Sequence, residues 1–224
     1  GIDHVQAVAT KAGIIRTATS FEGILYKGVG ADFRWDAIRE FLVAGQVPKI
    51  GSSYSDEVLV SSYLASRLNL KVGDKFNTFF LVQGQNRLPK ARRFKVVGIY
   101  NSGVKDFESV YIIGDIKHVQ RINHWRNDEV GSFEVFVADF DQIAQKGEEV
   151  YRETSSTLNS QTVTEKYYYI FDWLKLFDFN ILIIVLVMIA VSTINMVVAL
   201  LVLILERTQM IGILKSMGAN NWSI

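Results

Sequence analysis

The sequence has no cysteine among its 224 residues, and it has only two prolines and three histidines. Without cysteine, neither a disulfide nor a thiolate metal site is available to the fold. His4, His118 and His124 stand far apart and lack companions at the spacing of metal ligands, so we expect no metal site. The absence of cysteine is also compatible with an oxidising compartment.

Motifs of common catalytic and nucleotide-binding sites are missing as well. There is no Gly-x-x-x-x-Gly-Lys-Ser/Thr phosphate loop, so these residues do not hydrolyse ATP by that chemistry. The stretch 51–55 (GSSYS) lacks the Gly-x-Ser-x-Gly frame of a nucleophile loop and is interpreted as a turn. Residues 28–30 (GVG) hold only two glycines of a dinucleotide fingerprint and are interpreted as a bend. We therefore predict a non-catalytic chain that binds no cofactor of its own.

Charge is scarce in one part of the chain. The formal net charge is +1, which gives no strong attraction to nucleic acid. Most charged residues fall within 1–165, whereas Ile181 to Leu205 contain no ionisable side chain. With no initiator methionine or signal peptide at the start, the chain is interpreted as a piece of a longer protein.

The uncharged run predicts a membrane span over residues 180–205 (NILIIVLVMIAVSTINMVVALLVLIL). At about 1.5 Å per residue, a helix of this length exceeds the roughly 30 Å hydrocarbon core of a bilayer. Arg207 and Lys215 follow the run, whereas Asp172 and Asp178 precede it on either side of Lys175. Because positive charge favours the cytoplasmic side, we expect residues 206–224 inside and residues 1–163 outside the membrane.

Three polar residues interrupt the span. Ser192 and Thr193 can bond back to helix carbonyls, which is one interpretation of their presence in lipid. Asn195 does this less easily and is expected to face another helix, alongside Ser192 and Ala199. The span is therefore predicted to belong to a helix bundle.

Residues 164–179 (TEKYYYIFDWLKLFDF) precede the span. Tyr167, Ile170, Leu174, Phe177 and Ile181 follow a 3-4 spacing, which predicts one apolar stripe on a helix continuous with the span. The segment is either an aromatic anchor at the membrane surface or a rigid stalk that packs on a partner.

Residues 1–163 alternate short strand-like and helical runs without a regular βαβ rhythm, which predicts an α+β domain. Residues 35–43 have helical spacing, and roughly 40–115 are expected to form a second subdomain. Ser61 or Ser62 is predicted to cap a helix, as are Asp115 and Asp139.

Residues 83–90 form a polar loop, and Arg87 lies close to the basic run 90–93 (KARR). This run is either a solvated loop flank or a contact patch for a partner or for lipid headgroups.

After the span, Met210, Ile211, Leu214 and Met217 fall on one face of a predicted short amphipathic helix, and Gly218 stands at a C-cap position. Such a helix either lies on the membrane surface or inserts into a groove of a soluble partner.

Residues 206–219 (ERTQMIGILKSMGA) strongly resemble the coupling-helix signature of FtsX-like permeases. Residues 59–74 (LVSSYLASRLNLKVGD), 93–103 (RFKVVGIYNSG) and 26–29 (YKGV) resemble lipoprotein-releasing ABC transporter permeases of the LolC/LolE type. These permeases share a periplasmic core with MacB-type exporters, and the resemblance covers nearly the whole chain in the expected order.

The resemblance implies a multi-pass bacterial inner-membrane permease with four spans, of which this chain holds the second. It implies a second permease subunit, the same or paralogous, and two cytoplasmic ATPase subunits that hold ATP and Mg. The permease would extract a lipoprotein from the inner membrane and pass it to a periplasmic chaperone.

Residue roles follow from the same resemblance. The ATPase would be contacted by the coupling segment, namely Glu206, Arg207, Met210, Ile211, Leu214, Lys215, Met217 and Gly218. Acyl chains would be held by Trp173, Leu174, Phe177 and Ile181, and the chaperone is expected near Arg87, Pro89 and Arg92.

Three alternatives remain open on the sequence. One is a MacB-like exporter of peptides or drugs, and another is an FtsX-type regulator that transmits ATPase state to a cell-wall hydrolase. A membrane-anchored binding domain without an ATPase is disfavoured by the coupling signature.

Overall fold

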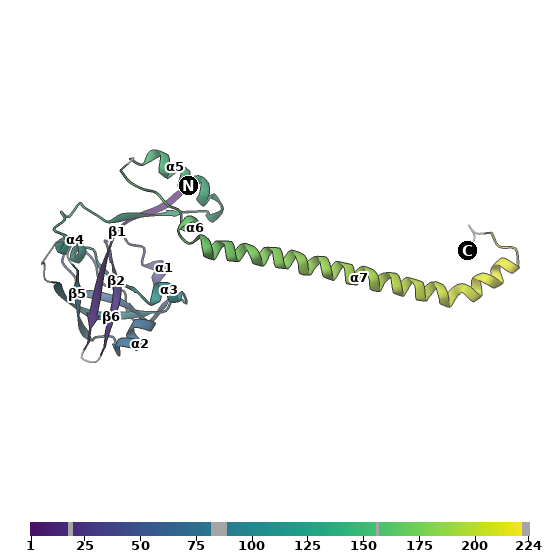
Figure 1. Cartoon of the computed structure of the whole chain (residues 1–224), viewed down its shortest axis with the longest axis horizontal. Helices are drawn as coiled ribbons and strands as arrows, with labels where there is room; N and C mark the ends of the chain where they lie inside the picture. The colour runs from purple at the N-terminus through teal and green to yellow at the C-terminus, as the bar shows by residue number, and fades with distance from the viewer. Residues whose placement is uncertain (18–19, 82–88, 156, 221–224) are drawn as a thin grey trace. The chain divides into compact units, whose positions relative to one another are not determined.

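The computed structural model of the chain describes residues 1–17, 20–81, 89–155 and 157–220. These residues fall into two compact units, Gly1–Lys146 and Gly147–Ile224. The strands are β1 (Ile2–Arg16), β2 (Phe21–Val29), β3 (Leu42–Gly45), β4 (Glu57–Ser61), β5 (Lys75–Phe80), β6 (Lys90–Tyr100), β7 (Tyr111–Asp115) and β8 (Ser132–Val137). The helices are α1 (Asp36–Arg39), α2 (Ser62–Leu68), α3 (Lys105–Glu108), α4 (Lys117–Asn123), η1 (Phe140–Gln142), α5 (Ile143–Glu153), α6 (Val163–Lys166) and α7 (Tyr168–Ser216) (Figure 1).

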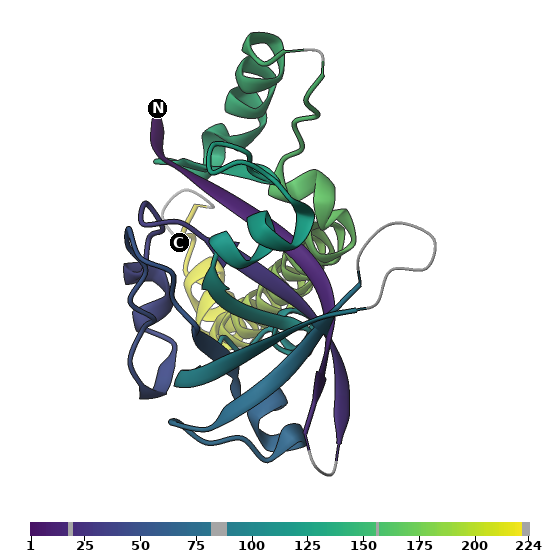
Figure 2. The same ribbon diagram turned by 90° about the vertical axis from the view of Figure 1, so that its left-hand side faces the viewer.

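The first unit is a mixed α/β domain built on one eight-stranded sheet. Seven strands follow the order β2-β7-β4-β6-β5-β1-β8, and the eighth, β3, pairs with β6. β1 also pairs with β2, so six of these strands close into a barrel, whose strong twist is visible in Figure 2. Closure depends on the length of β1, because its residues Gly13 to Arg16 pair with both β2 and β5. The other half of β1 pairs with β8, which extends the sheet beyond the barrel.

The barrel interior is the main hydrophobic core. Period-2 alternation along the strands sends Ile24 and Tyr26 of β2 and Phe76 and Phe80 of β5 inward. The Tyr26 ring stacks on Phe94, with 5.1 Å between ring centroids. α2 and α4 complete this core through Leu64, Leu68, Val119 and Ile122.

A second, smaller core lies on the outer face of the sheet. Val8, Val29, Leu59, Tyr100 and Ile113 are buried there under the segment that connects β2 to β4. Phe33, Trp35, Ile38 and Leu42 provide the cover.

The helix predicted over residues 35–43 is wrong in its second half. Only Asp36–Arg39 is helical, and Leu42 begins β3, which pairs with Tyr100 of β6. β5 pairs only with residues 90–95 of β6, so the C-terminal end of β6 has a free side whose ladder hydrogen bonds outweigh the helical spacing of the sequence. Gly45, at φ +79°, lies so close to β6 that a Cβ atom would stand 2.1 Å from the Val97 carbonyl oxygen.

The part of the chain that the structure describes contains neither the separate subdomain nor the bend at Gly28 that the sequence predicted. The subdomain expected near 40–115 is not a separate body, because β3 to β7 belong to the same sheet as β1 and β2. Gly28 lies within β2 rather than in a bend, and a Cβ there would stand 2.7 Å from the Cα of Ile116.

Two of the predicted caps are confirmed. Ser61 caps α2 by accepting a hydrogen bond from the Leu64 N–H at 3.1 Å, and Asp139 caps η1. Asp115 ends β7 instead of serving as the N-cap of α4, although its carboxylate accepts from the Lys117 N–H at 3.0 Å.

In the second unit, a capping box begins the short helix α6. Thr162 Oγ1 accepts from the Glu165 N–H at 3.2 Å, and the Glu165 carboxylate accepts from the Thr162 N–H at 2.8 Å. Tyr167 interrupts the helix with non-helical dihedral angles, and α7 begins at Tyr168. The segment predicted as one helix over 164–179 is therefore broken at Tyr167.

Candidate functional site

α7 joins the three predicted segments, namely the aromatic approach, the span and the C-terminal segment, in one helix of 49 residues. At about 1.5 Å per residue it is roughly 74 Å long, more than twice the hydrocarbon thickness of a bilayer. Among the described residues, this is the one helix long and apolar enough to cross a membrane. With residues 180–205 in the bilayer, helical backbone projects beyond both surfaces.

The N-terminal part of α7 exposes aromatic side chains. Trp173 and Phe177 are one helical turn apart, and their rings meet edge to face with centroids 4.5 Å apart. Leu174 and Ile181, from the predicted acyl-chain set, are exposed on the same helix. These four side chains give the N-terminal part of α7 a broad apolar surface that leads into the span and is open to a ligand or to a neighbouring helix.

In the middle of α7, the structure separates the polar residues of the span. Thr193 Oγ1 donates to the Ile189 carbonyl at 2.8 Å, so its hydroxyl is satisfied within the helix as one interpretation proposed. The side-chain amide of Asn195 has no hydrogen-bond partner within the described part of α7. Asn195 shares a helix face with Ser192 and Ala199, because their spacing is three and four residues.

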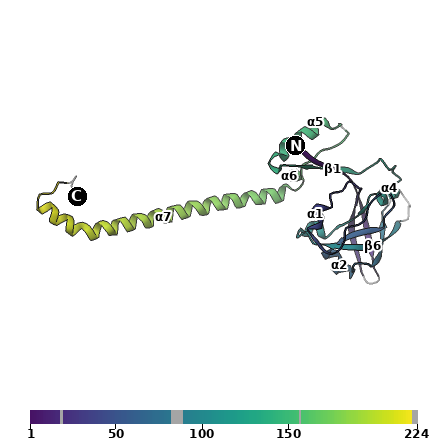
Figure 3. The same ribbon diagram turned by 180° about the vertical axis from the view of Figure 1, so that it is seen from behind.

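The C-terminal part of α7 continues the helix rather than forming a separate one. Thr208 Oγ1 donates to the Leu205 carbonyl at 2.6 Å, and Figures 1 and 3 show α7 bending in this region. Back-bonding of this kind often bends helices. The bend sets the last turns at an angle to the span.

The predicted contact residues lie on these last turns. Met210 and Met217 are exposed, Ile211 and Leu214 are half-buried, and Glu206, Arg207 and Lys215 are exposed. The prediction that Gly218 ends the helix is confirmed. Its φ is +91°, the Gly218 N–H donates to the Lys215 carbonyl at 3.0 Å, and the Ala219 N–H donates to the Leu214 carbonyl at 3.1 Å.

The first unit carries a second candidate surface, at the basic run. Lys90 Nζ donates to the Ile122 carbonyl at 3.0 Å and lies 2.9 Å from His124 Nε2. Arg92 donates from Nη1 to the Ala91 carbonyl at 3.0 Å, whereas its buried Nε has no partner among the described residues. Pro89 is exposed, and Arg87 lies outside the described residues. Lys90 is thus tied to the end of α4 rather than freely solvated.

The sequence did not indicate which residues adjoin this surface. His118, set aside as isolated, is fully buried, with Nδ1 2.8 Å from Tyr54 Oη and Nε2 2.9 Å from the Ser55 carbonyl oxygen. The Arg121 guanidinium lies over the Tyr54 ring at 5.9 Å from its centroid. Only strand pairing brings α4, β6 and residues 51–55 together, so no local signal could reveal this cluster.

Burial determines the protonation state of the cluster. It lowers the pKa of His118 from its ordinary value of 6.5, against the opposing effects of the Ser55 carbonyl and the Asp56 carboxylate. It also raises the pKa of Tyr54, with the neighbouring Arg92 acting in the opposite direction. A neutral His118 that donates from Nε2 and accepts from Tyr54 satisfies both ring nitrogens.

The stretch 51–55 is held in place by α4. Lys117 Nζ donates to the carbonyl oxygens of Gly51, of Ser52 at 3.0 Å and of Ser53 at 3.1 Å. The Ser55 N–H donates to the buried Asp115 carboxylate at 3.1 Å. These contacts are those of a fixed loop and include no nucleophile–base pair.

Comparisons with known proteins agree with the membrane helix. Residues 182–224 match the FtsX-like permease C-terminal family. This match and the long apolar helix support the FtsX-like permease superfamily of membrane proteins, as residues 206–219 indicated, without distinguishing the LolC/LolE branch.

One curated protein and one solved structure are also similar to the chain. An uncharacterised membrane protein of Buchnera aphidicola subsp. Schizaphis graminum (strain Sg) is 25% identical over 176 residues, 77% of this chain and 42% of that protein. The chain thus spans about two fifths of the length of this curated relative. The extracellular domain of the noncanonic ABC-type transporter YknZ from Gram-positive bacteria is 18% identical, with a TM-score of 0.45 over 72% of this chain and 79% of that chain.

Proposed function

We propose that the chain is part of an ABC transporter permease that extracts lipoproteins from the bacterial inner membrane and passes them to a periplasmic chaperone. The observation that carries the proposal is the unbroken course of α7 from Tyr168 to Ser216. One helix that projects from both membrane surfaces transmits displacement from a cytoplasmic partner to the outer side, because its backbone hydrogen bonds resist compression.

The cytoplasmic end would receive the movement. Met210, Ile211, Leu214 and Met217 form an apolar ridge beyond the bend, suited to a groove on an ATPase subunit. Glu206, Arg207 and Lys215 flank the ridge and would fix its register through charged contacts. ATP and Mg²⁺ would be bound by the ATPase, which supplies the hydrolysis.

The outer end would meet the substrate. Trp173, Leu174, Phe177 and Ile181 expose apolar surface next to the span, where the acyl chains of a lipoprotein emerge from the outer leaflet. Each acyl methylene that an apolar protein surface shields from water stabilises the complex by about 0.8 kcal/mol. This surface would therefore offset part of the free-energy cost of removing the lipoprotein from the bilayer. The exposed Pro89 and the adjacent Arg92 are candidates for the chaperone contact, together with Arg87.

The test is a detergent pull-down of the full-length permease from its native membrane, followed by mass spectrometry. We expect an ATPase subunit and triacylated lipoproteins to copurify. Leu214→Asp should lose the ATPase, because it places a charge in the docking ridge. Gln209→Asp adds the same charge on another face of the helix and should retain the ATPase.

Other outcomes point to the alternatives. An ATPase accompanied by a periplasmic hydrolase, with no lipoprotein, would favour an FtsX-type regulator. An ATPase domain on the permease polypeptide itself would favour a MacB-like exporter. Either result removes the acyl-chain role from Trp173 and its neighbours.

A further inference from the structure

β8 is an open edge of the sheet in the first unit. It is the last strand in the sheet order, and β1 is its one neighbour among the described strands. The backbone groups on its other side are therefore available to another strand.

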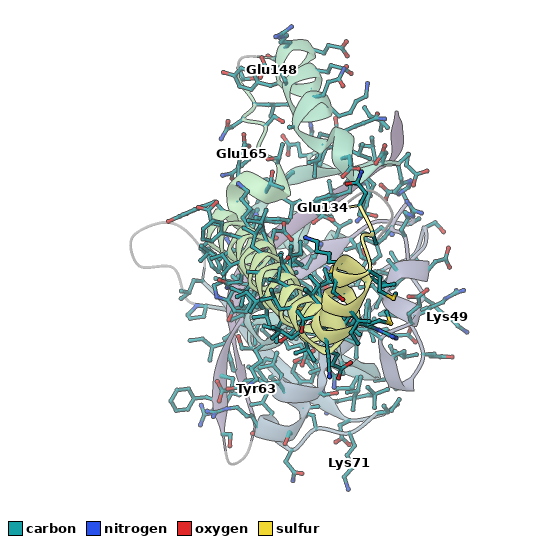
Figure 4. The ribbon with its side chains drawn as sticks, turned by 90° about the vertical axis from the view of Figure 1, so that its right-hand side faces the viewer. Lys49, Tyr63, Lys71, Glu134, Glu148 and Glu165 are labelled. Atoms are coloured by element: carbon teal, nitrogen blue, oxygen red, sulfur yellow. The ribbon has the colours of Figure 1, made fainter. Side chains whose placement is uncertain are left out.

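The edge lacks the features that usually prevent strand addition. Its sequence, SFEVFV, contains no proline, glycine or lysine and is rich in residues that favour strands. Its one charged side chain, Glu134 (labelled in Figure 4), lies 2.6 Å from Lys27 Nζ and accepts from Gln6 Nε2 at 2.8 Å. The charge that would repel another strand is therefore neutralised within the domain.

One face of the β1–β8 ribbon is apolar and uncovered. Val5 pairs with Val135, and Ala7 pairs with Phe133, so these side chains lie on the same face. Val5 is 46% exposed, Val135 38% and Phe133 58%. Val137 follows on this face and is half-buried.

We propose that β8 pairs antiparallel with β8 of a second copy of this chain, around a two-fold axis at Val135. Val135 would then lie opposite Val135 of the second copy, Phe133 opposite Val137, and Glu134 opposite Phe136. The apolar faces of both ribbons would join in one surface, with Val5 and Val135 of each copy in a single row. The sheets of the two domains would become continuous through β8.

The side-chain pattern and the length of the pairing together favour this register among the two-fold arrangements. An axis at Glu134 would set two carboxylates opposite each other, which is destabilising. An axis midway between Glu134 and Val135 would place the apolar face of one copy beside the polar face of the other, because side chains alternate along a strand. An axis at Phe133 or Phe136 also avoids these conflicts, but it pairs fewer residues of β8. The Val135 axis therefore gives the longest pairing that keeps apolar residues together and like charges apart.

A six-residue pairing is smaller than the roughly 1,000 Å² that a stable interface usually buries. In a membrane, however, each copy is already confined by its span, so the pairing adds to helix–helix contacts at high effective concentration. The inference is independent of the transported substrate, because it requires neither a lipoprotein nor an ATPase.

Residues 1–224 contain no cysteine, so none has to be removed from this part of the permease before the test. The full-length permease is prepared with Val135→Cys as its single cysteine, any cysteine outside residues 1–224 being replaced by serine. It is kept in its native membrane and oxidised with copper phenanthroline. Facing residues of an antiparallel pair have Cα atoms about 4.5–5.5 Å apart, within the range that a disulfide spans. We expect most of this variant to migrate as a disulfide-linked homodimer.

Ser132→Cys is the matched control. In the proposed register its counterpart lies six residues along the strand, about 20 Å away, so little dimer should form. Phe133→Lys added to Val135→Cys should lower the yield of cross-link, because it places a cation in the apolar row. Equal cross-linking of Val135→Cys and Ser132→Cys would overturn the register. A Val135→Cys adduct with a protein of different mass, or no adduct, would overturn pairing with a second copy.

Discussion

Thr78 presents an energetic cost at the scale of a single residue. It lies on β5, is fully buried in the barrel, and its hydroxyl has no hydrogen-bond partner among the described residues. An unpaired buried hydroxyl costs about 1–3 kcal/mol, and a Val side chain has nearly the same shape without that group. Thr78→Val should therefore raise the free energy of unfolding by about 1 kcal/mol.

Thermal unfolding of the purified permease in detergent, followed by tryptophan fluorescence, measures the Thr78→Val effect. Thr78→Ser serves as the control, since it keeps the unpaired hydroxyl, removes a buried methyl group and should destabilise. A Val variant no more stable than wild type would show that the hydroxyl has a partner in solution.

His118 makes stability depend on pH. Burial lowers its folded-state pKa below 6.5, so below that pH the unfolded chain binds a proton that the folded chain does not. Above pH 6.5 the protonation of His118 does not affect the free energy of unfolding. As the pH falls from 6.5 to the folded-state pKa, the free energy of unfolding decreases, and below that pKa the loss stays constant. The Tm of wild type should drop between pH 7.5 and 5, and that of His118→Gln should drop less. Equal slopes would exclude His118 as the source.

At the scale of the element, the cap of α2 combines two contacts. Ser61 Oγ accepts from the Leu64 N–H at 3.1 Å and lies 2.5 Å from the Glu108 carbonyl oxygen, to which it donates. Ser61→Ala loses the cap and leaves both groups unpaired in the core, so it should destabilise by about 2 kcal/mol. Chemical denaturation measures the free energy of unfolding of this variant and of its control, Ser66→Ala. Ser66 is exposed on the same helix, so its replacement should leave the free energy of unfolding nearly unchanged. A neutral Ser61→Ala would contradict this assignment.

α7 offers a prediction about association in the membrane. The Asn195 amide has no hydrogen-bond partner in the part of the chain that the structure describes, and it lies on the face shared with Ser192 and Ala199. Pairing across helices should therefore stabilise a bundle by about 1 kcal/mol. Asn195→Leu should weaken span–span association in a membrane two-hybrid assay. Val197→Leu, on another face, should leave it unchanged. The idea fails if both variants behave alike.

The elements that sequence analysis predicted well are those whose signals are local. The uncharged run 180–205, the Ser61 cap and the Gly218 stop each depend on residues within a few positions, and each is found as a helix or helix end. β3 was missed because its conformation is imposed by pairing with the C-terminal end of β6, about fifty residues later. The closure of β1 on β2 and β5, and the position of His118 against Tyr54, depend on similar long-range pairing.

At the scale of the whole molecule, α7 and the charges around it should determine orientation. Arg207 and Lys215 follow the span, whereas Asp172, paired with Lys175 at 3.4 Å, and Asp178 precede it. Because positive charge is retained on the cytoplasmic side, we expect the barrel outside and the Gly218 end inside.

Single-cysteine labelling tests this orientation, because residues 1–224 contain no cysteine and any cysteine elsewhere in the permease can be replaced by serine. Ser66→Cys, exposed on α2, should react with a membrane-impermeant maleimide in cells whose outer membrane alone is permeabilised. Ser216→Cys, at the end of α7, should react only after the inner membrane is also opened. The reverse pattern would place the barrel in the cytoplasm, and the proposed roles of the C-terminal ridge and of the aromatic surface would both be lost. Labelling of both sites in intact inner membranes would mean that α7 does not span the bilayer.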